Sequence, residues 1–167
     1  MNRLFRVGVF LASVCAIVSA DCLPGYTQRD PDQNGNCYKM HRTTHSWFYS
    51  EQICRADGGW LATVRDDTDA NWVNAFFIYN RGNCDDDHYW IGATDAANEG
   101  TWKWGEDGSN AVVSKNWWSS GEPNNKGNED CVEVDSRNLR WNDEKILDHQ
   151  RCFICETHPK GWCDCAN

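Results

Sequence analysis

The spacing of apolar residues along the chain predicts two helices early and several short strands late. Apolar side chains of residues 46–56 fall on one helical stripe, with Thr43-Thr44 as the expected cap and Gly58-Gly59 as the end. Residues 66–80 repeat this spacing behind a typical capping residue. Strands are predicted for six short runs, 60–64, 89–93, 101–104, 131–134, 139–141 and 151–156. This order of elements indicates an α+β fold.

Two stretches depart from this regular pattern. Cys22 and Cys37 flank Asn34-Gly35, the strongest short signal for a β-hairpin, so we expect an N-terminal hairpin closed by a disulfide. Residues 105–128 are rich in Gly, Ser, Asn and Asp and predict a long loop. Loops of this length in compact domains usually carry function or are disordered, and the tryptophans within it argue against disorder.

Residues 1–20 have the features of a secretory signal peptide. Arg3 and Arg6 precede an apolar run that ends in small residues, which signal peptidase prefers. The run is short for a transmembrane helix, and an uncleaved anchor is the alternative. We therefore expect a secreted, extracellular protein without membrane insertion, with one domain over residues 21–157 and a cysteine-containing tail over 158–167.

The charge of the chain excludes some partners. Removal of residues 1–20 lowers the formal net charge from −9 to −11, which makes nucleic acid and anionic membranes poor partners. Such acidity suits a metal cation if the acids converge, although it also serves solubility.

Ten cysteines are present, and nine remain after residue 20. In a secreted chain these residues indicate disulfides before metal sites, and the odd number leaves at least one thiol free or paired between chains. A zinc cluster built from Cys152-x-x-Cys155 and Cys163-x-Cys165 is the less favoured alternative, because the compartment is oxidising.

Tryptophan is also frequent, with ten residues. An indole buries a large apolar area, so most are expected in the core: Trp60, Trp90, Trp102, Trp104, Trp117 and Trp141. Trp118 stands just before the acidic part of the long loop, and we consider it as a face on which a sugar stacks.

The long loop and the strand after it hold a set of oxygen donors, Glu122, Asn124, Glu129, Asn142 and Asp143. Ca²⁺ takes six to eight oxygen ligands in irregular geometry, whereas Zn²⁺ would need His or Cys, which these segments lack. Five protein donors leave positions that two neighbouring sugar hydroxyls can fill. The same carboxylates accept hydrogen bonds from those hydroxyls while the amides donate to them.

The chain resembles the C-type lectin domain family over nearly its whole mature length. The resemblance is carried by several pieces together: Cys22-Leu23-Pro24-Gly25-Tyr26, Cys37-Tyr38, Gly59-Trp60-Leu61-Ala62, Trp90-Ile91-Gly92, Asn116-Trp117, Gly121 to Asn124, Glu129-Asp130-Cys131, Trp141-Asn142-Asp143 and Phe153-Ile154-Cys155-Glu156. It implies a C-type lectin-like double-loop fold with two helices, two small antiparallel sheets and a long calcium-binding loop.

The resemblance also implies roles for individual residues. The five donors become the sugar-binding calcium site, and the Glu122-Pro123-Asn124 triplet, with Pro123 in cis, indicates mannose-type ligands: mannose, fucose, glucose or N-acetylglucosamine. The galactose-type triplet is Gln-Pro-Asp. A second calcium site is implied at Asp95, Glu99, Asn125 and Asp130.

The family pattern further implies the disulfides Cys22–Cys37, Cys54–Cys155 and Cys131–Cys152. The last pairing is an adaptation, since the usual partner soon after Trp141-Asn142-Asp143 is missing. Of the two tail residues Cys163 and Cys165, one is expected to tie down Cys84 and the other to link a homodimer.

These features favour calcium-dependent glycan recognition, with agglutination or innate immunity as its use. Paired carboxylates also occur in glycoside hydrolases, but a general acid needs a raised pKa whereas calcium ligands must stay ionised, so we expect no enzyme. The main alternative is a lectin-like domain that binds a protein, mineral or ice surface.

Overall fold

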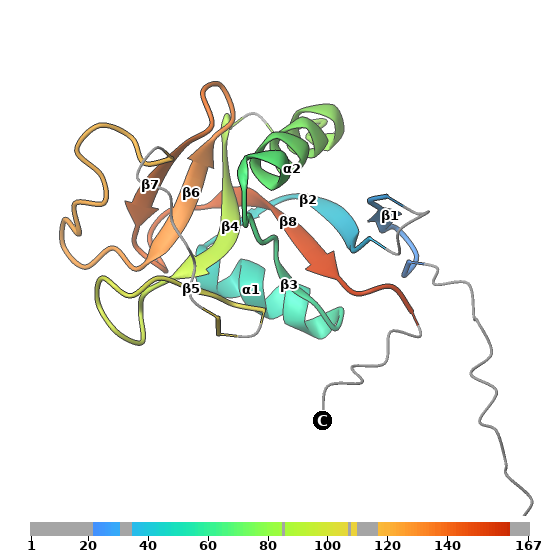
Figure 1. Cartoon of the computed structure of the whole chain (residues 1–167), viewed down its shortest axis with the longest axis horizontal. Helices are drawn as coiled ribbons and strands as arrows, with labels where there is room; N and C mark the ends of the chain where they lie inside the picture. The colour runs from blue at the N-terminus through green and yellow to red at the C-terminus, as the bar shows by residue number, and fades with distance from the viewer. Residues whose placement is uncertain (1–21, 31–34, 85, 107, 110–116, 161–167) are drawn as a thin grey trace, which may run out of the picture.

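The structure is a computed structural model that describes residues 22–30, 35–84, 86–106, 108–109 and 117–160. The predicted signal peptide and the tail cysteines Cys163 and Cys165 lie outside these ranges. Ten elements follow one another (Figure 1): β1 (Thr27–Gln28), β2 (Cys37–His45), α1 (Trp47–Ala56), β3 (Trp60–Leu61), α2 (Asp67–Asn80), β4 (His88–Thr94), β5 (Lys103–Trp104), β6 (Cys131–Asp135), β7 (Arg140–Glu144) and β8 (Arg151–Thr157).

Both predicted helices are present, and their ends have local causes. α2 begins after Asp66, whose side chain accepts a hydrogen bond from the backbone N–H of Asp69 at 2.8 Å. α1 ends before Gly58, which has a φ of +80° and lets the chain leave the helix in the left-handed region. The predicted boundaries therefore hold to within one residue for both helices.

β2 is the element that the sequence pattern missed. The strand runs over nine residues, and its last part contains Thr43-Thr44, which we expected as the cap of α1. The N-cap of α1 is instead Ser46. Polar and partly exposed side chains such as Lys39 interrupt the apolar alternation, so periodicity gave no strand signal. The predicted N-terminal hairpin is confirmed, because β1 pairs antiparallel with β2.

The strands join in one mixed sheet with the order β1-β2-β8-β4-β6-β7, to which β3 adds on β8 and β5 on β4. We expected two small antiparallel sheets. Here β4 and β8 run parallel at the centre, with Tyr89 opposite Cys152, and so connect the two halves. β7 forms the edge next to the long loop between β5 and β6 (Figure 1). This α+β arrangement agrees with the predicted fold class.

The sheet separates two apolar clusters, one under each helix. Alternating side chains of β8 face opposite ways, so Ile154 belongs to the cluster that contains Phe77 of α2, and Phe153 belongs to the cluster that contains Trp47 of α1. In Figure 1 the two helices accordingly lie on opposite sides of the central strands. Each of the six tryptophans expected in the core is buried.

Three disulfides are formed in the described ranges. Cys22–Cys37 and Cys54–Cys155 are confirmed. The third joins Cys84 to Cys152, with the Cα atoms 6.3 Å apart, so the expected link from Cys84 to a tail cysteine is wrong. Cross-links of this kind restrict the unfolded chain and thereby stabilise the folded domain.

The predicted Cys131–Cys152 disulfide is wrong, and the strand order explains why. Cys131 lies on β6 and Cys152 on β8, with β4 between them. Neighbouring strands are about 4.8 Å apart, so two strand spacings alone exceed about 9 Å. The two residues are also offset along β4, because Cys131 pairs with Thr94 and Cys152 with Tyr89. Bridged Cα atoms lie within about 7 Å. Cys84 follows α2 and meets β8 on the near side instead.

Cys131 is a free, fully buried thiol whose Sγ lies 3.0 Å from the backbone carbonyl oxygen of Glu144. It is inaccessible to a second chain, so only Cys163 and Cys165 remain for the expected covalent homodimer. No helix in the described ranges is long and apolar enough to cross a bilayer.

Candidate functional site

The predicted site loop is fastened to β7 by one buried carboxylate. Asp143, 1% exposed, accepts hydrogen bonds from the backbone N–H groups of Asn124 at 3.0 Å and Asn125 at 2.7 Å. Asn125 has a φ of +47°, a left-handed conformation that Asn tolerates better than most residues. Asp143 therefore sets the path of the loop through its two oxygen atoms.

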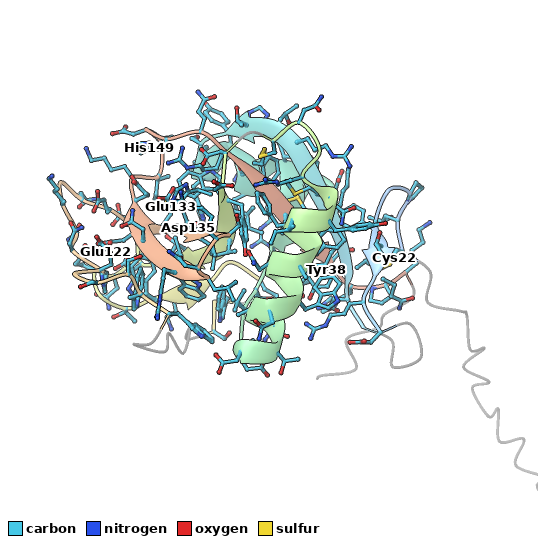
Figure 2. The ribbon with its side chains drawn as sticks, turned by 90° about the horizontal axis from the view of Figure 1, so that it is seen from above. Cys22, Tyr38, Glu122, Glu133, Asp135 and His149 are labelled. Atoms are coloured by element: carbon cyan, nitrogen blue, oxygen red, sulfur yellow. A yellow bond between two sulfur atoms is a disulfide. The ribbon has the colours of Figure 1, made fainter. Side chains whose placement is uncertain are left out.

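The Glu122-Pro123-Asn124 triplet lies at the turn of this loop. The Glu122–Pro123 peptide bond is cis, as expected. The Nδ2 of Asn124 donates to the Oε2 of Glu122 at 2.5 Å, so the side chains of the first and third residues lie on the same side of the turn. Figure 2 shows Glu122 at the end of the molecule that is distant from Cys22.

Glu129 closes the other end of the loop. Its backbone N–H donates to the Oδ1 of Asn125 at 2.8 Å, and its Oε2 accepts from the backbone N–H of Lys126 at 2.9 Å. These contacts turn residues 125–129 back toward the start of the loop. The pKa of Glu122 is raised by burial first, then by the nearby Asp143 and Glu129 carboxylates.

The acidic residues of this region lack basic partners. Within the described ranges, none of the following six carboxylates forms an ion pair: Asp95, Glu99, Glu122, Glu129, Asp130 and Asp143. Like charges held together in this way repel one another unless a cation lies among them. The local charge therefore favours a bound cation.

In the described ranges, the side chain of Asn142 contacts two carboxylates of the sheet and not the other four donors of the predicted set. Its Nδ2 lies 3.4 Å from the Oε1 of Glu133 and 3.3 Å from the Oε1 of Glu144, on the face of β7 opposite Asp143. The structure thus groups Glu122, Asn124, Glu129 and Asp143 around one loop and turns the Asn142 amide nitrogen toward two further carboxylates.

One of the residues implied for a second calcium site, Asp95, is a buried acid near Glu99 and Asp130. Asp95 is 2% exposed, and its Oδ1 has no hydrogen-bond partner among the described residues. Its Oδ2 accepts from the backbone N–H of Gly100 at 2.8 Å. Burial raises the pKa of Asp95, and the charges of Glu99 and Asp130 raise it further. A buried carboxylate oxygen without a donor is the feature that a cation would satisfy.

The donors fit Ca²⁺ in kind. They are oxygen atoms only, they include acids without basic partners, and one buried oxygen is orphaned. Their present spacing is wider than a coordination shell: no three His, Cys, Asp or Glu side chains in the described part of the chain are close enough to hold an ion. The amide nitrogens of Asn124 and Asn142 donate to Glu122 and Glu133, and these bonds do not use the amide oxygens.

Trp118 is not the sugar-stacking face that we considered. Its ring is only 9% exposed and packs against Trp102 and Trp141, with ring centroids 5.2 and 5.9 Å away. This burial leaves too little exposed surface for a sugar to stack on. Trp118 instead supports the start of the site loop through the core.

The sequence reasoning missed three charged residues beside the site, Glu133, Glu144 and Arg151. Glu133 is 5% exposed in the middle of β6, between Val132 and Val134. A charged residue in a short strand that is otherwise apolar is the one sequence signal that pointed to it, since such residues are rarely buried without a partner.

The comparisons with known proteins agree with this fold. The model of the Lectin C-type domain matches residues 43–157. A perlucin-like protein of Mytilus galloprovincialis is 30% identical over 168 residues, which cover 93% of this chain and 100% of that protein. Human CD209 antigen is 36% identical over 123 residues, or 73% of this chain, which spans only 28% of CD209.

Two solved structures share the fold at lower identity. The carbohydrate-recognition domain of cow CD23, solved in the presence of a GlcNAc2Man3 oligosaccharide, is 22% identical with a TM-score of 0.67, covering 84% of this chain and 98% of its own. A calcium-independent type II antifreeze protein is 20% identical with a TM-score of 0.67, covering 83% of this chain and 95% of its own.

Fold and site together define a disulfide-stabilised α+β binding domain with an acidic, oxygen-rich loop on a central sheet. The chain belongs to the C-type lectin domain family. Members are generally non-enzymatic modules that bind carbohydrate, and the family generally binds Ca²⁺.

Proposed function

We propose that this chain binds glycans through Ca²⁺ held by the predicted donors, Glu122, Asn124, Glu129, Asn142 and Asp143. The observation that carries the proposal is the convergence of Glu122, Glu129 and Asp143 on one loop without a basic partner in the described ranges. The bound ion supplies open coordination positions for two neighbouring hydroxyls of a pyranose ring.

The protein groups have complementary tasks toward those hydroxyls. An ionised carboxylate such as Glu122 or Glu129 only accepts, so it orients a hydroxyl hydrogen. The amide of Asn124 both donates and accepts, and its N–H group fills the remaining lone pair of a sugar oxygen. Charge-assisted hydrogen bonds of this kind are the stronger ones, so they give the shallow site its specificity.

Mannose-type sugars are the proposed ligands. The order of acid and amide in Glu122-Pro123-Asn124 matches the family pattern that binds two equatorial hydroxyls, as in mannose, fucose, glucose and N-acetylglucosamine. Asn124 already lies beside Glu122 on one side of the turn, which supports a common target for the two side chains.

A second Ca²⁺ at Asp95, Glu99, Asn125 and Asp130 is proposed as a structural ion. The unpartnered Oδ1 of Asp95 supports this assignment. Asn125 connects the two sites, because its backbone N–H donates to Asp143 while its Oδ1 accepts from Glu129. An ion at the second site would therefore stiffen the loop that carries the first.

We further propose that the protein is secreted and acts on glycan-rich surfaces, in agglutination or innate immunity. A single shallow site binds weakly, so several sites must act together. Association of copies through Cys163 or Cys165 would supply this multivalency.

The test is a glycan array on the refolded protein with Ca²⁺ and with EDTA. We expect mannose-type binding that EDTA abolishes. The paired substitution Glu122→Gln with Asn124→Asp creates the galactose-type triplet and should move binding to galactose, while the same protein keeps its Ca²⁺ dependence. Binding that persists in EDTA would refute the calcium mechanism.

A surface-binding lectin-like domain is the second candidate. It is favoured by the spacing of the acids, because no three His, Cys, Asp or Glu side chains in the described ranges are close enough to hold an ion. The fold also occurs in a calcium-independent antifreeze protein. An array without any bound glycan, combined with binding to a protein, mineral or ice surface, would favour this candidate.

A further inference from the structure

The side-chain amide of Asn142 lies between two carboxylates. Glu133 is its direct cross-strand partner in the β6–β7 ladder, and the Oε1 of Glu133 lies 3.4 Å from the Asn142 Nδ2. The Oε1 of Glu144 lies 3.3 Å from the same nitrogen on the other side. Both acids can only accept, so they select the orientation in which the amide nitrogen faces them.

Glu133 is held in place from behind. Its Oε2 accepts from the Nε of Arg151 at 2.8 Å, which leaves the Oε1 for Asn142. Arg151 is itself fixed by the Oδ2 of Asp86 at 2.8 Å and by the ring of Trp90, 6.0 Å from its guanidinium carbon. Glu133 is thus a buried carboxylate that contacts Arg151 with one oxygen and Asn142 with the other. The position of Arg151 therefore helps to fix the position of the Asn142 amide.

Glu144 is held from the solvent side. The Nε2 of His149 lies 3.3 Å from its Oε2. In Figure 2 Glu133 and His149 lie toward the same end of the molecule as Glu122. On the other side, the contacts of Arg151 and Glu133 connect Asp86, which precedes β4, to Asn142 on β7.

We propose that Glu133, anchored by Arg151, is a positioning residue for the glycan and Ca²⁺ site, because it sets the orientation of the Asn142 amide. The proposal rests on the function proposed above. The nitrogen and oxygen of an amide point in different directions from the same carbon. With Nδ2 turned to Glu133 and Glu144, the Oδ1 of Asn142 faces away from both acids and is kept available as an oxygen donor.

The opposite orientation explains why this matters. An Asn142 amide turned by 180° would place its Oδ1 against two carboxylates and its NH₂ where an oxygen donor is needed. The Oδ1 would be repelled by the carboxylates, and the NH₂ would be repelled by the cation. Partners that orient a metal ligand typically contribute 10–100-fold to metal affinity.

The experiment measures Ca²⁺ affinity by titration calorimetry for the wild type and for Glu133→Gln. The glutamine cannot accept from both Arg151 and Asn142 without turning its own NH₂ toward a donor. We expect Ca²⁺ to bind about 10–100-fold more weakly. The matched control is Asp135→Asn, on the same strand as Glu133. It breaks the ion pair between Asp135 and Arg137, has no contact to Asn142, and should leave the Ca²⁺ affinity unchanged.

A compensating swap separates positioning from a purely structural ion pair. Asn142→Asp alone adds a third carboxylate beside Glu133 and Glu144. Combined with Glu133→Gln, it reverses donor and acceptor and again leaves an oxygen facing away from β6. We expect the double variant to bind Ca²⁺ more tightly than either single variant. Additive losses in the double variant would overturn the proposal.

A readout without calcium keeps the two proposals distinguishable. In ¹H–¹⁵N spectra of the calcium-free protein, the side-chain NH₂ of Asn142 should be shifted and protected, and Glu133→Gln should abolish both. If the wild type binds no Ca²⁺, the proposed function falls. If it binds Ca²⁺ and Glu133→Gln binds equally, only the positioning role falls. If Glu133→Gln does not fold, Arg151→Lys replaces it, with a several-fold loss expected.

Discussion

The backbone N–H of Asn124 donates to the carboxylate of Asp143 at 3.0 Å, across nineteen residues of chain. This bond fastens the tip of the long loop to the edge strand of the sheet. Residues 119–130 of this loop contain no helix or strand, so their path depends on such contacts with β7. The relationship also means that one side chain serves the fold and the candidate site together.

Replacement of Asp143 by Asn should affect both. An amide has a single oxygen, so one of the two N–H groups held by Asp143 loses its acceptor, at a cost of about 1–3 kcal/mol in the free energy of unfolding. Ca²⁺ affinity should fall at least about tenfold. Urea unfolding and calorimetry measure the two effects. Asp148→Asn, which breaks the exposed pair with Lys145, is the control and should change neither.

Asp95→Asn should have opposite effects with and without calcium. Burial raises the pKa of Asp95. At neutral pH its negative charge therefore lowers the free energy of unfolding of the calcium-free protein. An uncharged amide keeps the bond to Gly100 and removes that charge, so the calcium-free variant should unfold at higher urea concentration than the wild type. In saturating Ca²⁺ the order should reverse. A variant that is destabilised in EDTA would contradict this prediction.

His41 should make the protein sensitive to acid. Its ring stacks on Phe153 at 4.6 Å and its Nε2 has no hydrogen-bond partner in the described ranges. Burial, then the charge of Lys39, lowers the pKa of His41 from 6.5 to about 4. The unfolded chain therefore binds a proton that the folded chain does not, and stability falls as the pH drops from about 6.5 to about 4.

The substitution His41→Phe keeps the stacking and removes the titration. Because the ring is only partly buried, we expect about 2 kcal/mol less loss of stability than in the wild type between pH 7 and pH 4.5. Urea unfolding in EDTA at the two pH values measures the difference, since the other titrating groups are common to both proteins. Parallel losses in the two proteins would rule out His41 as the source.

The free thiol of Cys131 should be unreactive as long as the protein is folded. It is fully buried, and burial raises its pKa well above the usual value, so little thiolate is available. Iodoacetamide should modify Cys131 only after unfolding. A non-reducing peptide map should place Cys84 with Cys152. Any peptide that joins Cys131 to another cysteine would contradict the structure.

Loss of the Cys84–Cys152 link should be more damaging than loss of the free thiol. Replacing both residues by Ala should lower the free energy of unfolding by about 2–4 kcal/mol, because the link closes a loop of 68 residues. Cys131→Ala removes only the packing of one sulfur and should change stability less. Urea unfolding under non-reducing conditions compares the two.

Local chemistry made much of this protein predictable from its sequence. The start of α2 follows from the capping carboxylate of Asp66, and the end of α1 follows from Gly58, because caps act within a few residues. The donor set of the site loop can also be read from the sequence, and its role in binding stays a prediction. β2 was not predictable, because Lys39 and the threonines hide its apolar alternation.

What only the tertiary structure decided is how distant segments meet. The sheet order places β4 between Cys131 and Cys152, which excludes their disulfide and gives Cys152 to Cys84. Strand alternation turns Asn142 away from Asp143 and toward Glu133, and the aromatic cluster buries Trp118. Composition and spacing along the chain set which elements form, whereas the pairing of strands far apart in sequence sets which side chains share a face. The periodicity of apolar residues within one strand does not predict which distant strand it will pair with.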